Sequence, residues 1–349
     1  MYNSVLPYNI RISIVSACNM ACVYCPRYTS MENYTPSQHK QRELSTEEFF
    51  TMVSNLLQGV KFNSISITGG EPFLNPDIDK IIKAIRPYAF QLELNTNGSV
   101  VNYKKWEQIA PFLDVVKISM DTVNKELFNS ITQVTSSRTL DKVMGFIDNV
   151  LEKGIKVVVN SVVSKINMEH IDELIDWASN KGVNIHFLDF YFTEEVRSFW
   201  EENFIPVEAI MPLLEERFGV PQEDHSYGCA FFRYKTGPNT YIRIKSSFAG
   251  TMRSEKCENC SVYCQEGLYA VKLSREGWAT VCPSDLEEDG NLLSPEMGIE
   301  KAYHAVRGLL KELDRAKSKQ DSFQELIKKQ HLKVNEITQE ILDQWESKG

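Results

Sequence analysis

Two patterns of apolar and polar residues, one typical of strands and one typical of helices, alternate along most of this chain. Between residue 10 and about residue 217, short β-branched runs are followed by amphipathic stretches, which is typical of βα units and a parallel sheet. Six such units are too few for a closed eight-stranded barrel, so we expect an α/β fold, a partial (β/α)6 TIM-like barrel with its ligand at the strand carboxyl ends. The predicted strands are Ile10–Ser16, Ser64–Thr68, Gln91–Asn95, Val115–Met120, Lys156–Val163 and Asn184–Phe190.

Helix-start signals support this reading of the first half. The run Ser45-Thr46-Glu47-Glu48 has the spacing of a capping box, in which a serine and a glutamate three residues later satisfy each other's backbone amides. Pro76 and Asp77 open the next predicted helix. Both signals lie between predicted strands, where a βα unit requires a helix.

The pattern changes after about residue 220. Short strands are predicted at Tyr241–Lys245, Tyr269–Leu273 and Ala279–Val281, the last two joined by a turn at Arg275-Glu276-Gly277. From Pro295 onward the sequence is charged and helical. We therefore predict a barrel domain over residues 1–220, a small β-hairpin module over residues 221–294 and C-terminal helices over residues 295–349. One apolar stripe in the last segment comprises Leu309, Leu313, Phe323, Leu326 and Ile327.

Composition narrows the classes of function. The chain has 349 residues and a formal net charge of -9, so it lacks the broad basic surface of an extended nucleic-acid binder. It has no signal-peptide pattern at its N-terminus and no apolar run of about 18 residues, the length that a membrane span needs. We expect a cytoplasmic protein without membrane or extended nucleic-acid partners, whose cysteines stay reduced and serve metal ligation or catalysis.

The eight cysteines form two groups and one isolated residue, Cys229. The first group, Cys18, Cys22 and Cys25, follows the first predicted strand directly, so one loop presents three thiolates at the mouth of the sheet. An iron-sulfur cluster normally takes four thiolates, and three leave one iron open for a chelating ligand. A structural zinc site is the alternative, but it favours four closed protein ligands.

The spacing CxxxCxxC with an aromatic residue before the last cysteine resembles the radical S-adenosylmethionine (SAM) superfamily. The resemblance implies a [4Fe-4S] cluster on catalytic Cys18, Cys22 and Cys25, whose open iron binds SAM and whose electron cleaves it to a 5′-deoxyadenosyl radical. Further motifs of that superfamily follow in order at the ends of predicted strands. By resemblance, the SAM contacts are Tyr24, Gly69, Gly70, Glu71, Pro72, Asn97, Ser119, Asp121, Asn160, Leu188 and Tyr191.

Each of these residues alone has an ordinary structural explanation. Ser119 suits a strand-end hydroxyl, Asn97 a turn and Asn160 a satisfied buried amide. A cofactor pocket, however, requires polar groups on successive strand ends, which is where they occur together. We therefore expect a SAM pocket at the carboxyl edge of the sheet, with Glu71 and the neighbouring backbone facing the SAM ammonium.

The second cysteine group has the spacing CxxCx3Cx12Gx4C. Four cysteines suit a closed zinc site as well as an iron-sulfur cluster, so spacing alone leaves the two equal. Beside a radical SAM core the pattern resembles the twitch or SPASM modules of that superfamily, which implies an auxiliary [4Fe-4S] cluster. Cys229 is either a further ligand or a small buried apolar residue. The predicted metal ligands here are Cys257, Cys260, Cys264 and Cys282.

The order of features over the first 285 residues resembles the molybdenum-cofactor GTP 3′,8-cyclases. By that resemblance Arg11 and Lys272 contact substrate, although Arg11 also suits a surface position at a strand start. The match breaks at Ser64 and Val158, which stand where the cyclases carry nucleotide-binding lysines, and at the last residues, which lack the catalytic Gly-Gly pair. We therefore expect a different product from theirs.

The leading hypothesis is an enzyme that abstracts hydrogen from a small biosynthetic molecule, leading to oxidation, epimerisation or rearrangement. A one-electron donor such as flavodoxin or ferredoxin is the implied partner, and the auxiliary cluster carries electrons. The alternative is a peptide-modifying maturase that forms crosslinks or epimers. Because the cysteine loop begins at residue 18, we expect no leader-binding domain before it, and a separate protein would then supply leader recognition. A non-enzymatic metal scaffold is a third class, which the SAM motifs disfavour.

Overall fold

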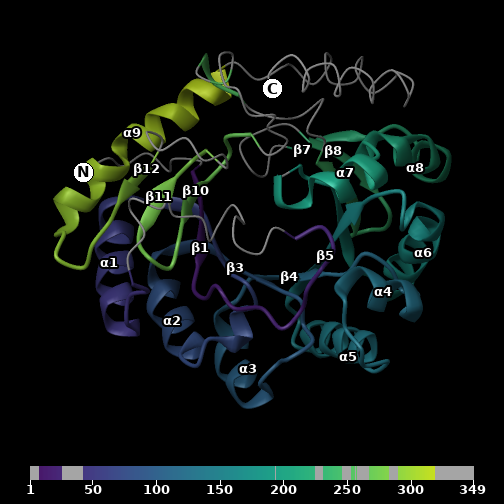
Figure 1. Cartoon of the computed structure of the whole chain (residues 1–349), viewed down its shortest axis with the longest axis horizontal. Coiled ribbons are helices and arrows are strands. Elements are labelled where there is room, and N and C mark those ends of the chain that lie inside the picture. The colour runs from purple at the N-terminus through teal and green to yellow at the C-terminus, as the bar shows by residue number, and fades with distance from the viewer. Residues whose placement is uncertain are drawn as a thin grey trace.

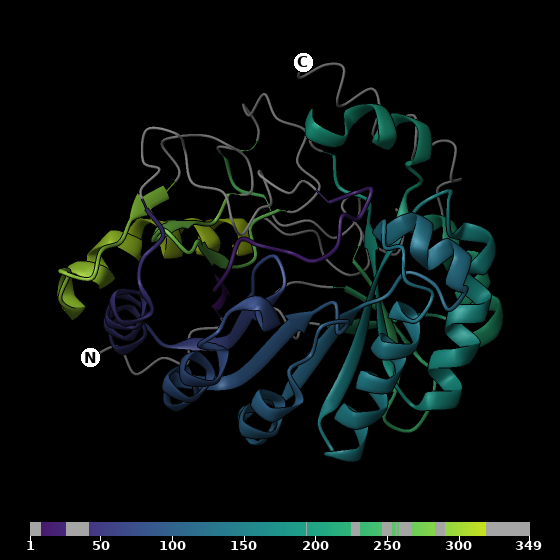
Figure 2. The same ribbon diagram turned by 60° about the horizontal axis from the view of Figure 1, so that its bottom comes forward.

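The computed structural model describes residues 8–25, 42–192, 194–224, 231–245, 253–255, 257, 267–282 and 290–318. Within these residues the strands form one 12-stranded sheet in the order β12-β11-β10-β1-β2-β3-β4-β5-β6-β9-β8-β7. Figures 1 and 2 show the sheet curving like part of a barrel, with the first six helices on its outer side. The predicted fold class is confirmed.

The elements follow one another as strands and helices along the chain. The strands are β1 (Asn9–Ser13), β2 (Phe62–Thr68), β3 (Ala89–Thr96), β4 (Val115–Ser119), β5 (Lys156–Val163), β6 (Asn184–Asp189), β7 (Gln222–Asp224), β8 (Phe231–Lys235), β9 (Tyr241–Lys245), β10 (Val271–Leu273), β11 (Trp278–Thr280) and β12 (Gly290–Leu292). The helices are α1 (Thr46–Gly59), α2 (Ile78–Ile85), α3 (Tyr103–Ile109), α4 (Lys125–Thr132), α5 (Thr139–Glu152), α6 (Ile171–Lys181), α7 (Arg197–Asn203), α8 (Met211–Phe218) and α9 (Ile299–Ser318).

All six strands predicted for the barrel are present and parallel, which confirms the βα assignment. The bounds of β5 coincide with the prediction. The first strand ends at Ser13 rather than Ser16, because the chain beyond it turns into the cysteine loop. Ile14 still donates its backbone amide to the Thr68 carbonyl at 3.0 Å, so the loop leaves the sheet gradually.

The C-terminal strands extend this sheet at both ends, an arrangement that the sequence pattern did not predict. Strand β10 lies parallel to β1, with Ile10 beside Val271, and β9 lies parallel to β6, with Ile185 beside Ile242. The predicted hairpin of β10 and β11 is confirmed as an antiparallel pair. The strands from β10 through β6 to β9 therefore form one continuous parallel surface. The proposed domain boundaries stay a prediction.

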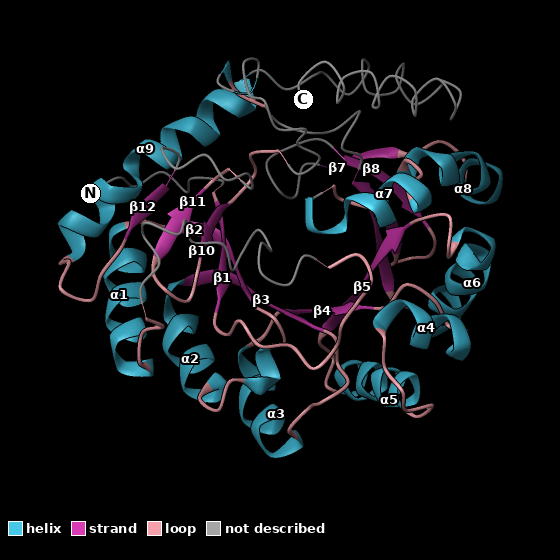
Figure 3. Cartoon of the chain, viewed as in Figure 1, coloured by secondary structure: helices cyan, strands magenta, loops and turns pink. Residues whose placement is uncertain are grey.

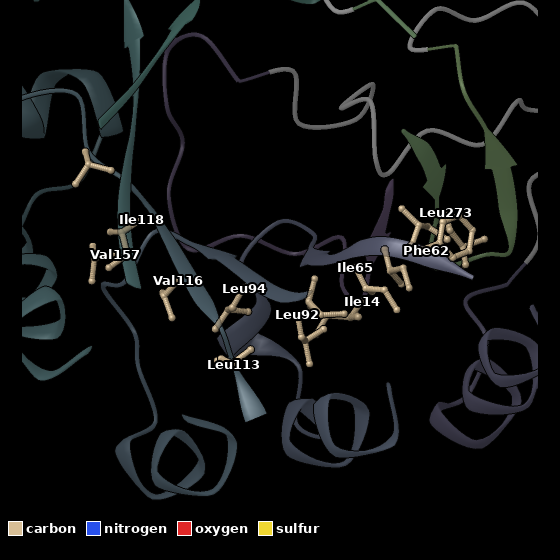
Figure 4. Close-up of a cluster of buried hydrophobic side chains, with 14 of the residues drawn as sticks. Ile14, Phe62, Ile65, Leu92, Leu94, Leu113, Val116, Ile118, Val157 and Leu273 are labelled. Carbon is tan, nitrogen blue, oxygen red and sulfur yellow. The ribbon is translucent and has the colours of Figure 1, made fainter. Parts of the chain in front are cut away.

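The main apolar core lies between the sheet and the outer helices. Alternate strand residues such as Ile65, Leu94 and Ile118 are fully buried, and Figure 4 shows them directed from the strands toward the helices. Burying one such side chain stabilises the fold by about 1.5–3 kcal/mol. This core covers one face of each strand and leaves the other face for the barrel interior.

The helices begin where their cap residues predict. Ser45 and Glu48 form the expected capping box at the start of α1, and Asp77 precedes α2. Helix α9 packs on α1, as Figure 3 shows, and buries Leu309 and Leu313 of the predicted stripe. The other members of that stripe, Phe323, Leu326 and Ile327, lie outside the described residues. In the part of the chain that the structure describes, no helix has the length and apolar character to cross a membrane.

Candidate active site

The first cysteine loop lies at the carboxyl edge of the parallel sheet. Cys18 and Cys25 are exposed and Cys22 is half-buried. The loop is fixed on its other flank by backbone hydrogen bonds to the end of α4, from Ala21 to the Thr132 carbonyl at 3.1 Å and from Val23 to the Ile131 carbonyl at 2.9 Å. The three thiols are therefore presented on an anchored loop at the edge where parallel α/β sheets bind ligands.

The second strand continues directly into a glycine pair that packs against this loop. Gly70 donates its amide to the Val15 carbonyl at 2.7 Å, and Glu71 donates to the Ala17 carbonyl at 2.9 Å. A Cβ atom on Gly69 would stand 2.3 Å from the Val15 carbonyl oxygen, and one on Gly70 would stand 2.2 Å from that of Ala17. Only glycine permits this backbone approach. The motif therefore shapes the cysteine loop in addition to any contact with a ligand.

The Glu71 side chain is fully buried and has three donors. Its carboxylate accepts from the Thr96 hydroxyl at 2.6 Å and from the backbone amides of Asn97 at 2.7 Å and Phe73 at 3.1 Å. Burial nevertheless raises the pKa of this carboxyl, against the lowering effect of those hydrogen bonds. Glu71 thus ties the loop after β2 to the loop after β3. Its predicted contact with the SAM ammonium stays a prediction.

Asn97 follows β3 and lies beside the first cysteine, and its predicted contact with SAM stays a prediction. Its Nδ2 is 3.8 Å from Cys18 Sγ and donates to Asn19 Oδ1 at 3.0 Å. The Asn97 oxygen accepts from the Ser99 hydroxyl at 2.6 Å. Asn97 therefore orients the polypeptide around the first thiol.

Tyr24 and Asp121 form a buried pair next to the cysteines. The Tyr24 hydroxyl donates to Asp121 Oδ2 at 2.6 Å, and the Val162 amide donates to Oδ1 at 2.7 Å. Burial raises the pKa of Asp121 to about 6. The Tyr24 ring meets Phe190 edge-on, with the ring centroids 6.2 Å apart. Asp121 is thus placed to fix Tyr24, and a direct contact with SAM stays a prediction.

The surroundings of Cys18 and Cys22 raise the pKa of both thiols. Burial raises the pKa of Cys22, and the nearby Asp121, Cys25 and Cys18 raise it further. Burial also raises the pKa of Cys18. Mutual repulsion of thiolates is relieved when a cationic metal centre binds them, so the donor set suits a metal cluster.

The spacing of these thiols bears on the kind of metal centre. Within the described residues, no three His, Cys, Asp or Glu side chains converge as the ligands of one metal ion. An iron-sulfur cluster is held by thiolates on different irons, so its ligands need not meet at one point. Three thiols on one loop fit such a cluster with one iron left for another ligand.

A cavity of about 300 Å³ extends from the cysteine loop into the barrel. Of the residues predicted to hold cluster, SAM or substrate, six line it: Arg11, Tyr24, Cys25, Asn160, Leu188 and Tyr191. Ser119 lies at the same strand edge and is exposed, but it is not among the lining residues. Lys272 is 1% exposed, beside Arg11 in register, and does not line the cavity either. Its predicted substrate contact has no support from this placement.

Charged residues that the sequence reading missed line the deeper part of the cavity. Lys117 and Glu93 form a buried ion pair at 2.6 Å, and Arg243 pairs with Asp224 at 2.5 Å. His186 lies with them, and burial, followed by nearby Arg243, Lys117 and Lys156, lowers its pKa well below its usual value. Its imidazole is therefore neutral at physiological pH.

A sequence signal for these charges was available. In β1, β4 and β9 the apolar residues alternate with Arg11, Lys117, Arg243 and Lys245, so polar side chains recur on one face. A TIM-type barrel is ordinarily filled by branched apolar side chains. A charged inner face instead indicates a barrel that encloses a polar ligand.

The second cysteine group is only partly within the described residues. Cys257 is half-buried, and its amide donates to the Ser254 carbonyl at 3.0 Å. Cys282 is half-buried and follows the hairpin, with its amide bonded to the Thr280 hydroxyl at 3.1 Å. Cys229, Cys260 and Cys264 lie outside the described residues. The auxiliary cluster therefore stays a prediction.

Comparison with known proteins gives a match that includes the first cysteine loop and the strands beside it. The sequence of residues 12–178 matches the radical SAM superfamily. The matched region is therefore similar to a radical SAM domain and makes up slightly less than half of the chain. The matched region holds all three cysteines of the first loop, the glycine pair and strands β2 to β5.

Curated relatives extend the radical SAM similarity along the chain. The GTP 3′,8-cyclase of Nautilia profundicola is 34% identical over 188 residues, which cover 53% of this chain and 57% of that protein. The GTP 3′,8-cyclase of Clostridium perfringens strain 13 is 26% identical over 282 residues, covering 78% of this chain and 79% of the relative. The chain thus spans little more than half of the first relative.

Solved structures show the same fold at low sequence identity. Streptococcus suis SuiB bound to S-adenosylmethionine superposes with a TM-score of 0.56 and 15% identity, covering 82% of this chain and 63% of that one. SuiB bound to its precursor peptide SuiA gives the same TM-score and identity, covering 88% and 71%. The partial-barrel sheet of this chain therefore has a fold of the kind that SuiB has.

Proposed function

We propose that this protein is a radical SAM enzyme that acts on a small molecule bound inside its partial barrel. Cys18, Cys22 and Cys25 hold a [4Fe-4S] cluster with an open iron, and SAM binds beside it. The observation that carries the proposal is geometric: an anchored loop of three cysteines opens on the cavity that Tyr24, Asn160 and Leu188 line. The match of residues 12–178 to the radical SAM superfamily and the similarity to the SAM complex of SuiB support it.

The bound cluster and SAM supply a 5′-deoxyadenosyl radical that abstracts hydrogen from a substrate. The residues of this chain form the cavity in which SAM and the substrate would be held for this hydrogen abstraction. Near Cys25, the lining residues Tyr24, Phe190 and Leu188 form an apolar wall suited to the adenosyl group. Deeper in, the ion pair of Lys117 and Glu93 offers a polar floor for the substrate.

The relatives named GTP 3′,8-cyclase suggest a nucleotide, but this chain differs at the site. Ser64 lies on the cavity wall, where its hydroxyl donates to Asn9 at 2.9 Å, and Val158 lies beside the floor. Neither supplies the positive charge that the resemblance assigns to these positions. We therefore propose a substrate other than GTP, with oxidation, epimerisation or rearrangement as the outcome.

Two further parts of the proposal concern electrons and location. Cys257, Cys260, Cys264 and Cys282 are proposed to hold an auxiliary [4Fe-4S] cluster for electron transfer. A flavodoxin or ferredoxin is the proposed electron donor, and the cytoplasm, where thiols stay reduced, is the proposed compartment. The spacing of the second cysteine group beside a radical SAM core, which resembles the twitch and SPASM modules, supports the auxiliary-cluster assignment.

A peptide-modifying maturase is the second candidate. The observation that favours it is the similarity to SuiB bound to its precursor peptide. A peptide substrate would need to enter from the carboxyl edge of the sheet, since the cavity of about 300 Å³ holds a side chain rather than a folded peptide. Assaying small molecules and peptides separately for stimulated SAM cleavage distinguishes the two candidates.

Anaerobic reconstitution tests the proposed function. The wild-type protein, given iron, sulfide, SAM and dithionite, should form 5′-deoxyadenosine. A variant with Cys18, Cys22 and Cys25 changed to alanine should form none and lose about one cluster of iron, whereas Cys229→Ala should cleave SAM like the wild type. Persistent cleavage by the triple variant would refute the assignment. Zinc in the anaerobically purified protein would overturn the auxiliary-cluster proposal.

A further inference from the structure

A second cavity lies at the opposite end of the strands from the cysteine loop. It has a volume of about 150 Å³, and its lining includes the first residues of three strands, Val115 of β4, Lys156 of β5 and Tyr241 of β9. We call this cavity the amino-end pocket. Four residues line both this pocket and the larger cavity, and they form a layer between the two: Glu93, Lys117, His186 and Arg243.

Three basic side chains gather around the Tyr241 ring in the amino-end pocket. The Lys156 ammonium lies 4.8 Å from the ring centroid, and the guanidinium carbons of Arg243 and Arg233 lie 5.2 and 5.9 Å from it. A cation over such a ring gains about 0.5–2 kcal/mol, but cations this close together also repel one another. An anion bound among them relieves that repulsion.

The two outer cations of this pocket differ from the inner ones in their partners. The inner cations form the ion pairs with carboxylates described above. Arg233 donates to the neutral Gln222 side-chain oxygen at 3.3 Å, and both Arg233 and Lys156 approach the Tyr241 ring. Among the residues that the structure describes, neither has a carboxylate partner. Lys156 is exposed and Arg233 is half-buried, so a ligand from solvent can reach both.

The positive potential of these cations extends into the layer between the two cavities. His186 stacks on Tyr241, with the ring centroids 5.9 Å apart. Its pKa is lowered chiefly by burial, and then by the charges of Arg243, Lys117 and Lys156. The potential that disfavours a proton on His186 favours an anion in the adjoining pocket.

We propose that the amino-end pocket binds a phosphate group, free or carried by a small molecule, through the Lys156 ammonium and the Arg233 guanidinium. A guanidinium presents a planar fork to phosphate oxygens, and an ammonium acts as a compact point charge. Two cations match the double charge of a phosphate better than the single charge of a carboxylate. The pocket is smaller than the roughly 300–1,000 Å³ of ordinary small-molecule sites, which suits one phosphate group rather than a whole nucleotide.

Calorimetric titration of the reconstituted protein tests this site. The probes are inorganic phosphate, glycerol 3-phosphate as a phosphate ester, and acetate as a single negative charge. Lys156→Met and Arg233→Met each remove one cation, and Lys156→Arg retains the charge. Lys235→Met is the matched control, because Lys235 is exposed, lies opposite Tyr241 on β8 and does not line the pocket.

We expect the wild type to bind at least one phosphate probe saturably, and acetate at least about tenfold more weakly. Each methionine variant at the site should weaken phosphate binding at least about tenfold, the equivalent of about 1.4 kcal/mol. Lys156→Arg and Lys235→Met should bind like the wild type. Tighter binding of glycerol 3-phosphate than of inorganic phosphate assigns a phosphorylated small molecule to the pocket, and otherwise the ligand is free phosphate.

Several results would overturn the inference. These are no saturable binding of either phosphate probe, acetate binding of equal affinity, unchanged phosphate affinity in Lys156→Met or Arg233→Met, and an equal loss in Lys235→Met. Loss of binding in Lys156→Arg with an unchanged melting temperature also contradicts it, because the charge would then not be what binds. Formation of 5′-deoxyadenosine tests the proposed function separately, and its absence leaves the phosphate result standing.

Discussion

The outer faces of the strands carry apolar side chains, whereas the inner faces of the same strands carry charged ones. On β4, Val116 and Ile118 turn outward and are fully buried under the helices, whereas Lys117 between them turns into the barrel and pairs with Glu93. On β9, Ile242 and Ile244 are buried in the core, and Arg243 lines the cavity. The period of two in each parallel strand thus places apolar packing on the outer face and charged groups on the inner face, residue by residue. Four changes to the chain test this division, from the largest expected effect to the smallest.

The largest effect is expected on the inner face, at the buried ion pair. Glu93→Gln removes the carboxylate charge that lies 2.6 Å from the buried Lys117 ammonium. Removing one member of a buried pair costs about 3–5 kcal/mol of unfolding free energy. Urea titration of the metal-free protein measures it. Asp141→Asn, which breaks the exposed pair with Lys125, is the control and should cost no more than about 1 kcal/mol.

The next effect belongs to the outer face and is purely one of packing. Ile118→Ala opens a cavity in the core between β4 and the helices and should cost about 2–5 kcal/mol in the same titration. Ser119→Ala, at the exposed neighbouring position, should change stability by less than about 0.5 kcal/mol. Equal losses at the two positions would show that the strand faces are not divided as described.

The third effect is a pH dependence at the inner edge of β4. Asp121 has a pKa of about 6 in the folded protein, above the ordinary 3.8, so the folded state binds its proton more tightly than the unfolded state does. Its contribution to unfolding free energy therefore increases as pH falls from about 6 to about 4, by about 3 kcal/mol at most. The difference in unfolding free energy between the metal-free wild type and Asp121→Asn, measured across that range, reports it. A difference independent of pH contradicts the burial of this charge.

The smallest effect lies outside the sheet, at the start of α1. Ser45→Ala removes the side-chain acceptor of the capping box and should cost about 1 kcal/mol. The cap has no contact with the cavity in this account, so SAM cleavage should match the wild type. Loss of cleavage beyond what the lower melting temperature explains would show that the outer layer is coupled to the site.

The same division explains how far the sequence could predict the structure. The outward residues follow local rules, so strands such as Lys156–Val163 and caps such as Ser45 could be placed from the pattern alone. The first cysteine loop could also be predicted from the sequence, because its three cysteines lie close together in the chain. The pairing of β9 with β6 and of β10 with β1 joins residues far apart in the chain, and no local pattern specifies it.

The charged residues of the inner face show what the sequence could not predict. Glu93, Arg243 and Lys245 look like ordinary polar positions in alternating strands, and only the closing of the sheet brings them to one cavity. Lys272 was expected at the substrate only by resemblance to the cyclases; the structure places it beside Arg11 in register, 1% exposed and not among the lining residues, so its substrate contact stays a prediction. Which face of a strand encloses a ligand depends on curvature, and curvature is a property of the whole sheet.

The central claim is that the inner face of this sheet, beside the first cysteine loop, is a SAM-dependent active site. An anaerobic crystal structure of the reconstituted protein with SAM tests it most directly. We predict a cluster on Cys18, Cys22 and Cys25, with the adenosyl group in the cavity against Tyr24, Asn160 and Leu188. A cluster held elsewhere, or SAM bound outside the barrel, would contradict it.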